Sequence, residues 1–283
     1  MEKKILFILT VVLFLLPASL RAEEAVRLTR FQGQKITGVT AGGSFDVELV
    51  YTADRTQNRA VAEIDSRLEP YLTLEIDSQG VVRVGLNTPN RFSFNWNTAV
   101  RSKLTLYLGE LNRVTMSGSG KLRAGGSQPF PGNDIQVRVQ GSGGIRELNV
   151  SGNKLELSCS GSGSINMASR VDQVSMQIGG SGKIDLNAAS TTSAKATVSG
   201  SGSITLRGDG QQAEMVVAGS GSIRAEEFRT RQANVQISGS GSIRVFTEDS
   251  IEGTIAGSGN VRYKGNPQRV DVNKRGSGSI RAL

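Results

Sequence analysis

Residues 235–244 read Val-Gln-Ile-Ser-Gly-Ser-Gly-Ser-Ile-Arg, and this pattern, centred on Gly-Ser-Gly, recurs along most of the chain. Nine Gly-Ser-Gly tripeptides occur between residues 118 and 278, and successive copies are 23, 20, 19, 20, 19, 20, 18 and 19 residues apart. The first glycines of the nine copies are Gly118, Gly141, Gly161, Gly180, Gly200, Gly219, Gly239, Gly257 and Gly276. A nearly constant repeat of this length is typical of a solenoid, in which each repeat forms one coil that stacks on the next.

Apolar residues alternate with polar ones on both sides of each tripeptide. An aliphatic residue lies four positions after every first glycine: Leu122, Ile145, Ile165, Ile184, Ile204, Ile223, Ile243, Val261 and Ile280. Two positions before the first glycine the residues are Met116, Val139, Cys159, Ile178, Val198, Val217, Ile237 and Ile255, and only Lys274 breaks this column. Alternation with period two indicates strands with one buried face, which a flexible linker does not maintain. The sequence therefore predicts an all-β, single-stranded parallel β-helix with about 19–20 residues per coil.

The tripeptide itself is expected to form a structural corner. The alternation places both glycines inward and the serine outward, and glycine permits a positive φ and a close approach of neighbouring coils. The serines would then form an outward column of hydroxyls that bond to one another or to water. The other interpretation is a serine face that recognises a ligand such as ice or a crystalline polysaccharide.

The chain divides into three segments. Residues 1–22 are predicted to be a secretory signal peptide, with Lys3 and Lys4 before an apolar run from Ile5 to Leu16 that is too short to span a membrane. Residues 23–115 are predicted to be a β-rich N-terminal cap with the first coils, and residues 116–283 the repeat solenoid. No other transmembrane segment is expected, and no cysteine follows the signal to accept a lipid. We therefore expect export to the periplasm, the outer surface or the medium, but not as a lipoprotein.

The N-terminal segment has a different organisation from the repeats. Val39 to Ser44 resemble a degenerate first corner, and a polar stretch from Asn87 to Asn97 is expected to be a loop. The predicted strands are Phe45–Val50, Ala60–Ile64, Leu72–Ile76, Val81–Leu86 and Leu104–Leu108. Solenoids need caps because an open end exposes strand edges and core. Cys159, the single cysteine, is expected to be a buried free thiol.

Arginines recur five positions after the first glycine, on the outward side. This position holds Arg123, Arg146, Asn166, Asp185, Thr205, Arg224, Arg244, Arg262 and Arg281. The last four are predicted to form an unbroken column with about 4.8 Å between neighbours. Like charges at this spacing repel, so the column needs either carboxylate partners or an anionic ligand. Both interpretations stay open, and the carboxylates nearest in sequence are Glu214, Glu226, Glu227, Glu248, Asp249, Glu252 and Asp271.

The net charge is compatible with an acidic partner. Removal of the signal peptide takes away Lys3, Lys4, Arg21 and Glu2, which leaves 30 basic and 24 acidic residues and a net charge of +6. Acidic glycans or other envelope polymers are the candidate partners. Nucleic acid is not expected, because the chain has few aromatic residues and an export signal. At the C-terminal end, where Lys274, Arg275 and Arg281 lie on the last coil, end-to-end self-association is a further prediction.

Two longer stretches carry a family resemblance. They are Ile36-Thr-Gly-Val-Thr-Ala-Gly-Gly-Ser-Phe-Asp-Val-Glu-Leu and Leu104-Thr-Leu-Tyr-Leu-Gly-Glu-Leu-Asn-Arg-Val-Thr-Met-Ser-Gly-Ser-Gly, followed by the repeats. In this order the chain resembles the exported "putative autotransporter adhesin head domain" family, of DUF2807 type, from the cell envelopes of Bacteroidetes-like bacteria. The resemblance implies a right-handed parallel β-helix in an envelope or surface protein. It implies no catalytic residues, and an adhesive role rests there on the fold alone.

A polysaccharide-cleaving β-helix enzyme is the alternative function. The chain has no histidine, and its aspartates fall at different places in their repeats, so no stacked catalytic pair is expected. These aspartates are Asp134, Asp172, Asp185, Asp209, Asp249 and Asp271. A calcium repeat is not supported, because Asp185 alone follows a glycine-rich turn and the period is 19–20 residues instead of nine. The sequence thus favours a non-enzymatic binding or structural protein without a metal or cofactor.

Overall fold

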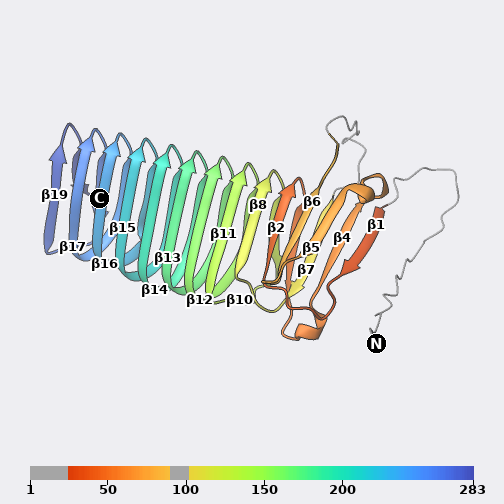
Figure 1. Ribbon diagram of the computed structural model, residues 1–283. Helices are drawn as coiled ribbons and strands as arrows, with labels where there is room; N and C mark the ends of the chain where they lie inside the picture. Colours follow the sequence, from red (N-terminus) through yellow and green to blue (C-terminus); the bar gives the residue numbers. More distant parts are fainter. Residues whose placement is uncertain (1–24, 90–101) are drawn as a thin grey trace.

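The computed structural model describes residues 25–89 and 102–283. Within these residues the chain forms an elongated solenoid of parallel strands, with antiparallel strands at its N-terminal end (Figure 1). The predicted signal peptide and residues 90–97 of the predicted loop lie outside the described residues. Among the residues described, no helix combines the length and hydropathy needed to cross a membrane.

The repeats form one coil each. The solenoid strands are β8 (Arg113–Gly118), β9 (Lys121–Gly125), β10 (Phe130–Pro131), β11 (Asp134–Gly141), β12 (Gly144–Gly161), β13 (Ser164–Gly180), β14 (Lys183–Gly200), β15 (Ser203–Gly219), β16 (Ser222–Gly239), β17 (Ser242–Gly257), β18 (Asn260–Lys264), β19 (Arg269–Arg275) and β20 (Ser279–Ala282). First glycines of successive coils are direct partners, for example Gly180 with Gly200 and Gly200 with Gly219. The predicted parallel β-solenoid with 19–20 residues per coil is therefore confirmed.

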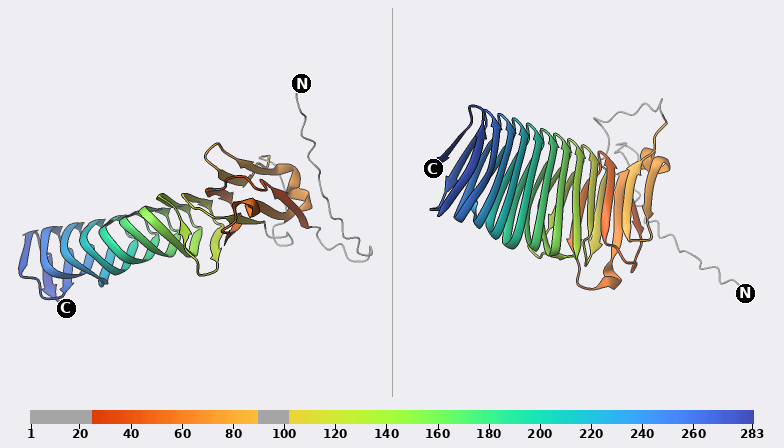
Figure 2. Two further views of the ribbon diagram at one scale, coloured as in Figure 1. Left: turned by 90° about the horizontal axis from the view of Figure 1, so that it is seen from below. Right: turned by 60° about the vertical axis from the view of Figure 1, so that its left-hand side comes forward.

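Each coil contains two extended segments that lie on opposite faces of the solenoid (Figure 2). We call the sheet that ends at the first glycine of each corner the pre-corner sheet. The sheet that begins after the second glycine is the post-corner sheet. The inward aliphatic side chains of both sheets pack between them and are buried as far as Val261, as the alternation predicts. Cys159 belongs to this core as a free thiol, and burial raises its pKa.

The two glycines of a corner serve different purposes. The first glycines have φ between +107° and +146°, a region that favours glycine, whereas the second glycines pack against the preceding coil. A Cβ added at Gly241 would lie 2.4 Å from Val217 Cγ1 and 2.7 Å from the carbonyl oxygen of Gly221. The second glycine is buried from Gly120 to Gly259, but the first is at least partly exposed in every copy. The prediction that both glycines point inward is therefore correct only for the second.

A second bend joins the two sheets on the side opposite the corner. Buried threonines there donate hydrogen bonds to backbone carbonyls of the preceding coil: Thr191 to Val171 at 3.1 Å, Thr230 to Gln211 at 3.0 Å and Thr247 to Arg231 at 2.8 Å. The registers of neighbouring coils shift near this bend, which accommodates unequal coil lengths. The spacing of the Gly-Ser-Gly corners does not predict this second bend.

The N-terminal cap continues both sheets and then closes them with antiparallel strands. Its elements are β1 (Ala25–Arg30), β2 (Gly38–Gly43), β3 (Asp46–Tyr51), η1 (Arg55–Gln57), β4 (Arg59–Asp65), η2 (Ser66–Tyr71), β5 (Leu72–Ile76), β6 (Val81–Leu86) and β7 (Lys103–Leu108). On the pre-corner side, β8 pairs with β2, β2 with β6 and β6 with β5; on the other side, β9 pairs with β3, β3 with β7, β7 with β4 and β4 with β1. The five predicted strands occur within one residue of their expected bounds. Gly43 pairs with Gly118, so the predicted degenerate first corner is also present.

Candidate functional site: an arginine column and a polar recess

The arginines that follow the corner stand on directly paired positions of the post-corner sheet. Arg224 pairs with Arg244, Arg244 with Arg262 and Arg262 with Arg281. The alternation that buries Ile223 and Ile243 turns the next residue outward, so all four arginines are exposed. Neighbouring strands lie about 4.8 Å apart, so four guanidinium groups are carried over a length of about 14 Å. We call these four residues the arginine column.

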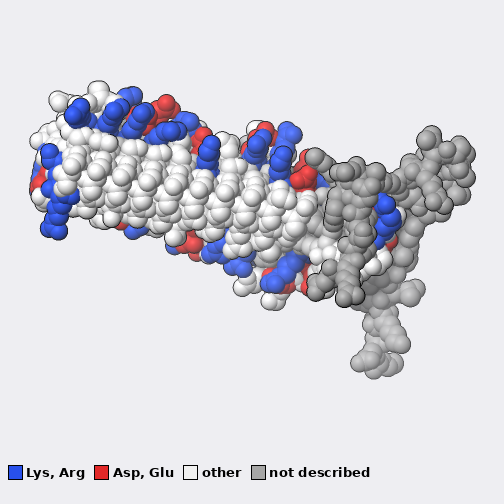
Figure 3. Space-filling model, turned by 90° about the horizontal axis from the view of Figure 1, so that it is seen from above, with Lys and Arg blue, Asp and Glu red and all other residues white. Residues whose placement is uncertain are grey.

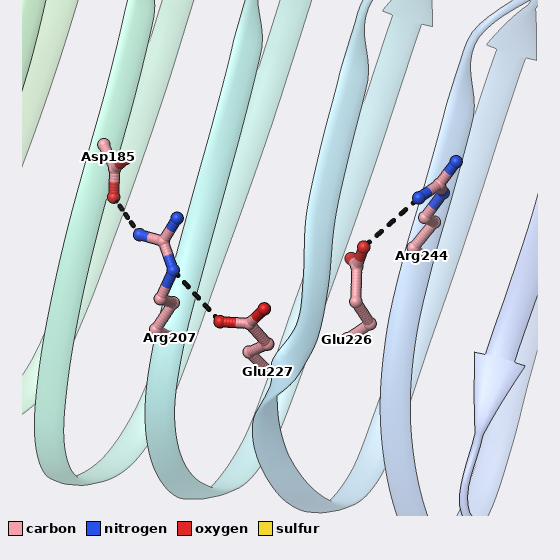
Figure 4. Close-up of polar contacts among 5 residues, drawn as sticks. All are labelled: Asp185, Arg207, Glu226, Glu227 and Arg244. Carbon is pink, nitrogen blue, oxygen red and sulfur yellow. Dashed lines mark hydrogen bonds and ion pairs between the residues drawn. The ribbon is translucent and has the colours of Figure 1, made fainter.

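The arginine column has few carboxylate partners within the described residues. Glu226 Oε1 lies 3.3 Å from Arg244 Nη1, and this is the ion pair of the column (Figure 4). Arg224, Arg262 and Arg281 form no ion pair within 4 Å among the residues that the structure describes. Glu226 is itself unusual, because its Oε2 is buried and has no hydrogen-bond partner.

The other nearby carboxylates bind different cations. Glu214 pairs with Lys195 at 2.8 Å, Glu227 with Arg207 at 3.1 Å and Asp249 with Arg231 at 3.9 Å. Glu252 and Asp271 both bind Arg269, at 3.2 and 2.9 Å. Of the seven carboxylates considered from the sequence, Glu226 thus reaches the arginine column, while Glu248 has no ion pair in the described part of the chain. Positive charge on the column is only partly neutralised.

The charged side chains leave one face of the solenoid largely free. Viewed onto the corners, the molecule has a band without charged side chains, with charged residues along both margins (Figure 3). Lysine and arginine side chains gather along one margin over the C-terminal coils. The corner serines are exposed, and from Ser119 to Ser258 their backbone N–H groups bond to the preceding coil, as between Ser240 and the carbonyl oxygen of Gly219 at 3.0 Å.

The arginine position is interrupted in the middle of the solenoid. Asn166 pairs with Asp185, Asp185 with Thr205 and Thr205 with Arg224, so three short side chains occupy consecutive coils. A recess of about 390 Å³ lies at this interruption. Its lining includes Glu147, Asn149, Asn166, Ala168, Asp185 and Asn187. Arg207 also borders the recess and donates hydrogen bonds to Asp185 and to Glu227 (Figure 4).

One rim of the recess is formed by an irregularity in β12. Ile145 pairs with Ile165 and Leu148 with Met167, so β12 has one extra residue between these pairs. Glu147, in this bulge, has φ of +57°, which is uncommon for a residue with a side chain. Its Oε2 accepts a hydrogen bond from Arg123 Nε at 2.7 Å. The two carboxylates of the recess, Glu147 and Asp185, are therefore each neutralised by an arginine.

Residues 25–89 and 102–283 contain no cluster of three or more His, Cys, Asp or Glu side chains that could hold a metal ion. Asp185 bonds to Arg207, and the bonds from Asp185 and Glu227 raise the pKa of that guanidinium. In this contact Asp185 accepts the hydrogen bond and Arg207 donates it.

The stacked parallel coils place this chain in the class of β-solenoid proteins. More narrowly, the chain belongs to the DUF2807 family, described as "Putative auto-transporter adhesin, head GIN domain", whose sequence profile matches residues 35–206 and 180–267. No curated protein sequence gives a significant match.

Solved structures of similar fold include three proteins from Parabacteroides. A putative adhesin from Parabacteroides merdae ATCC 43184 is 21% identical with a TM-score of 0.67, covering 92% of this chain and 95% of the other. A putative lipid binding protein from Parabacteroides distasonis ATCC 8503 is 26% identical with a TM-score of 0.64, covering 92% and 96%. A putative adhesin from the same strain is 19% identical with a TM-score of 0.66, covering 92% and 97%. The family and the fold predicted from the sequence are thus both confirmed.

Proposed function

We propose that this protein is an exported, non-enzymatic adhesion protein that binds acidic polysaccharide through the arginine column. The observation that carries the proposal is the direct pairing of Arg224, Arg244, Arg262 and Arg281 with Glu226 as the one carboxylate partner among the described residues. Four closely spaced positive charges attract a ligand with repeated negative charges. Membership of an adhesin-like family and the predicted signal peptide support a role outside the cytoplasm.

A polymer suits this surface better than a small anion. Each exposed ion pair contributes only about 0–1 kcal/mol, so a single contact would not hold a ligand. A chain that lies along the solenoid axis can meet several arginines at once, and its effective affinity then rises through multivalency. The paired charges of the pre-corner sheet, such as Lys195 with Glu214, offer no comparable row.

The test is binding of the purified protein to acidic and phosphorylated envelope glycans at low and physiological salt. The double variant Arg224→Ala/Arg244→Ala should reduce binding by up to about thirtyfold, since two contacts of about 0–1 kcal/mol each are lost. The matched control is Arg113→Ala/Arg138→Ala, which removes the same charge from the pre-corner sheet. This control should bind nearly as the wild type does.

Four outcomes would contradict the proposal. Equal loss in both double variants would indicate an effect of net charge instead of the column. Binding to anionic lipid vesicles but to no glycan would favour a lipid ligand, as the description of the neighbour from P. distasonis suggests for that protein. Release of shorter oligosaccharides from a bound polymer would favour the cleaving enzyme. Silence on every glycan would leave a structural envelope protein.

A further inference from the structure

We infer that the recess between Asn166, Asp185 and Asn187 is a second binding site, which accepts an uncharged sugar unit. It lies on the post-corner sheet where the arginine position is occupied by short polar residues. Longer side chains flank this gap, with Arg123 and Arg146 on one side and Arg224 on the other. The site does not depend on ligand binding by the arginine column.

The shape of the recess follows from side-chain size. Asn149 pairs with Ala168, Ala168 with Asn187 and Asn187 with Arg207, so the small Ala168 lies between two asparagines. The bulge at Glu147 raises one rim, and Arg207 borders the opposite side. Bulges are common beside binding sites because they redirect a side chain out of the regular pattern. The result is an open depression about 390 Å³ in volume on an otherwise regular sheet.

The chemistry of the lining favours hydroxyl groups over ions. Glu147 is bonded to Arg123 and Asp185 to Arg207, so the local charges cancel in pairs. Among the described residues, the amides of Asn166 and Asn187 have no hydrogen-bond partner, and both are exposed. An amide both donates and accepts, and so does a sugar hydroxyl. The small side chain of Ala168 leaves room for the C–H face of a sugar ring.

Neither an anion nor a metal fits this lining as well. An anion would meet the carboxylates of Glu147 and Asp185, while a metal ion lacks a set of three ligands within the described chain. Among the described lining residues there is also no aromatic ring on which a sugar could stack. We therefore expect the recess to bind a single sugar unit weakly. As at the arginine column, multivalent binding of a polymer would raise the effective affinity.

The experiment uses uncharged hexasaccharides of glucose, mannose, xylose and N-acetylglucosamine as probes. Binding is followed by NMR of the ¹⁵N-labelled protein in about 1 M NaCl, where the Debye length is about 3 Å and the arginine column is screened. At least one hexasaccharide should shift the amide signals of residues 166–168 and 185–187. Asn166→Ala/Asn187→Ala should weaken that binding roughly tenfold, because each amide contributes a hydrogen bond.

A second variant tests the recess by shape. Ala168→Phe fills its floor from an outward strand position and should abolish sugar binding, whereas Ala218→Phe, at an exposed position of β15 outside the recess, should not. Thermal melting of both variants verifies that the fold is retained. Binding that survives Ala168→Phe, or no shift with any hexasaccharide, would overturn the site. Arg224→Ala/Arg244→Ala should keep sugar binding, so failure of the recess and failure of the column are distinguishable.

Discussion

At the scale of single residues, the Gly-Ser-Gly corner depends on two unrelated physical requirements. The first glycine is needed for its backbone conformation, with φ of +120° at Gly239. The second is needed for space, because Gly241 packs against Val217 and the carbonyl oxygen of Gly221. Ser240 between them is exposed, and its backbone supplies the hydrogen bond to the preceding coil. Periodicity alone identified the corner but could not separate these requirements.

This difference predicts the effect of substitutions within one corner. Gly241→Ala should destabilise the protein by about 3 kcal/mol, since the new Cβ meets a backbone carbonyl that cannot move freely. Ser240→Ala should change stability by less than about 0.5 kcal/mol, because the side chain is exposed. Urea unfolding followed by circular dichroism measures both variants. Equal stability of Gly241→Ala and the wild type would show that the coils can separate at the corner.

At the scale of elements, the sequence predicts the corner on one side of each coil but not the second bend on the opposite side. The corner and the inward columns were predicted because Gly-Ser-Gly and the aliphatic residues recur at fixed spacing. The second bend was missed because its positions hold dissimilar residues, such as Val171, Thr191 and Gly210. The column of arginines was predictable as a column, but its partners were not. Side-chain reach decides that Glu214 bonds to Lys195 and that Glu226 bonds to Arg244.

The recess, too, could be predicted from the sequence only in part. The residues Asn166, Asp185 and Thr205 were visible in sequence as a gap in the arginine position. The recess also needs the extra residue at Glu147 and the pairing of Ala168 with Asn187. Neither follows from the spacing of the corners, because the longer steps of the repeat do not show where the additional residue lies.

The second bend provides a prediction about element stability. Thr230 is buried, and its hydroxyl bonds to the carbonyl oxygens of Gln211 at 3.0 Å and Gln232 at 3.3 Å. Thr230→Val keeps the shape but removes the donor, and should therefore cost about 1–2 kcal/mol. Thr192→Val, at an exposed position near the same bend, is the control and should be nearly neutral. The prediction fails if the two variants unfold at the same urea concentration.

At the scale of the whole molecule, the two sheets differ in their surface side chains, and the two ends of the solenoid differ in how they are covered. The post-corner sheet carries the arginine column and the recess, whereas several charges on the pre-corner sheet are paired, as Lys154 with Glu156 at 2.6 Å. The N-terminal end is closed by the antiparallel strands β1, β4 and β5. The last described coil has no comparable cover among the described residues, and Val270 is 44% exposed there. The proposed binding along the side and the predicted association at this end thus involve different surfaces.

The predicted end-to-end self-association depends on Lys274. This lysine pairs with Ile255 and continues the inward column of Val217, Ile237 and Ile255, so it places a charge where the next coil would pack. An inward charge at a strand edge opposes pairing with another chain. The wild type should therefore associate only weakly and at high concentration, while Lys274→Val should form larger species, measured by sedimentation velocity. Arg275→Val removes the same charge from the outward side of β19 and should not have this effect. A wild type that is strictly monomeric at every concentration would exclude self-association. A strictly monomeric Lys274→Val would show that other features of this coil prevent association at this end.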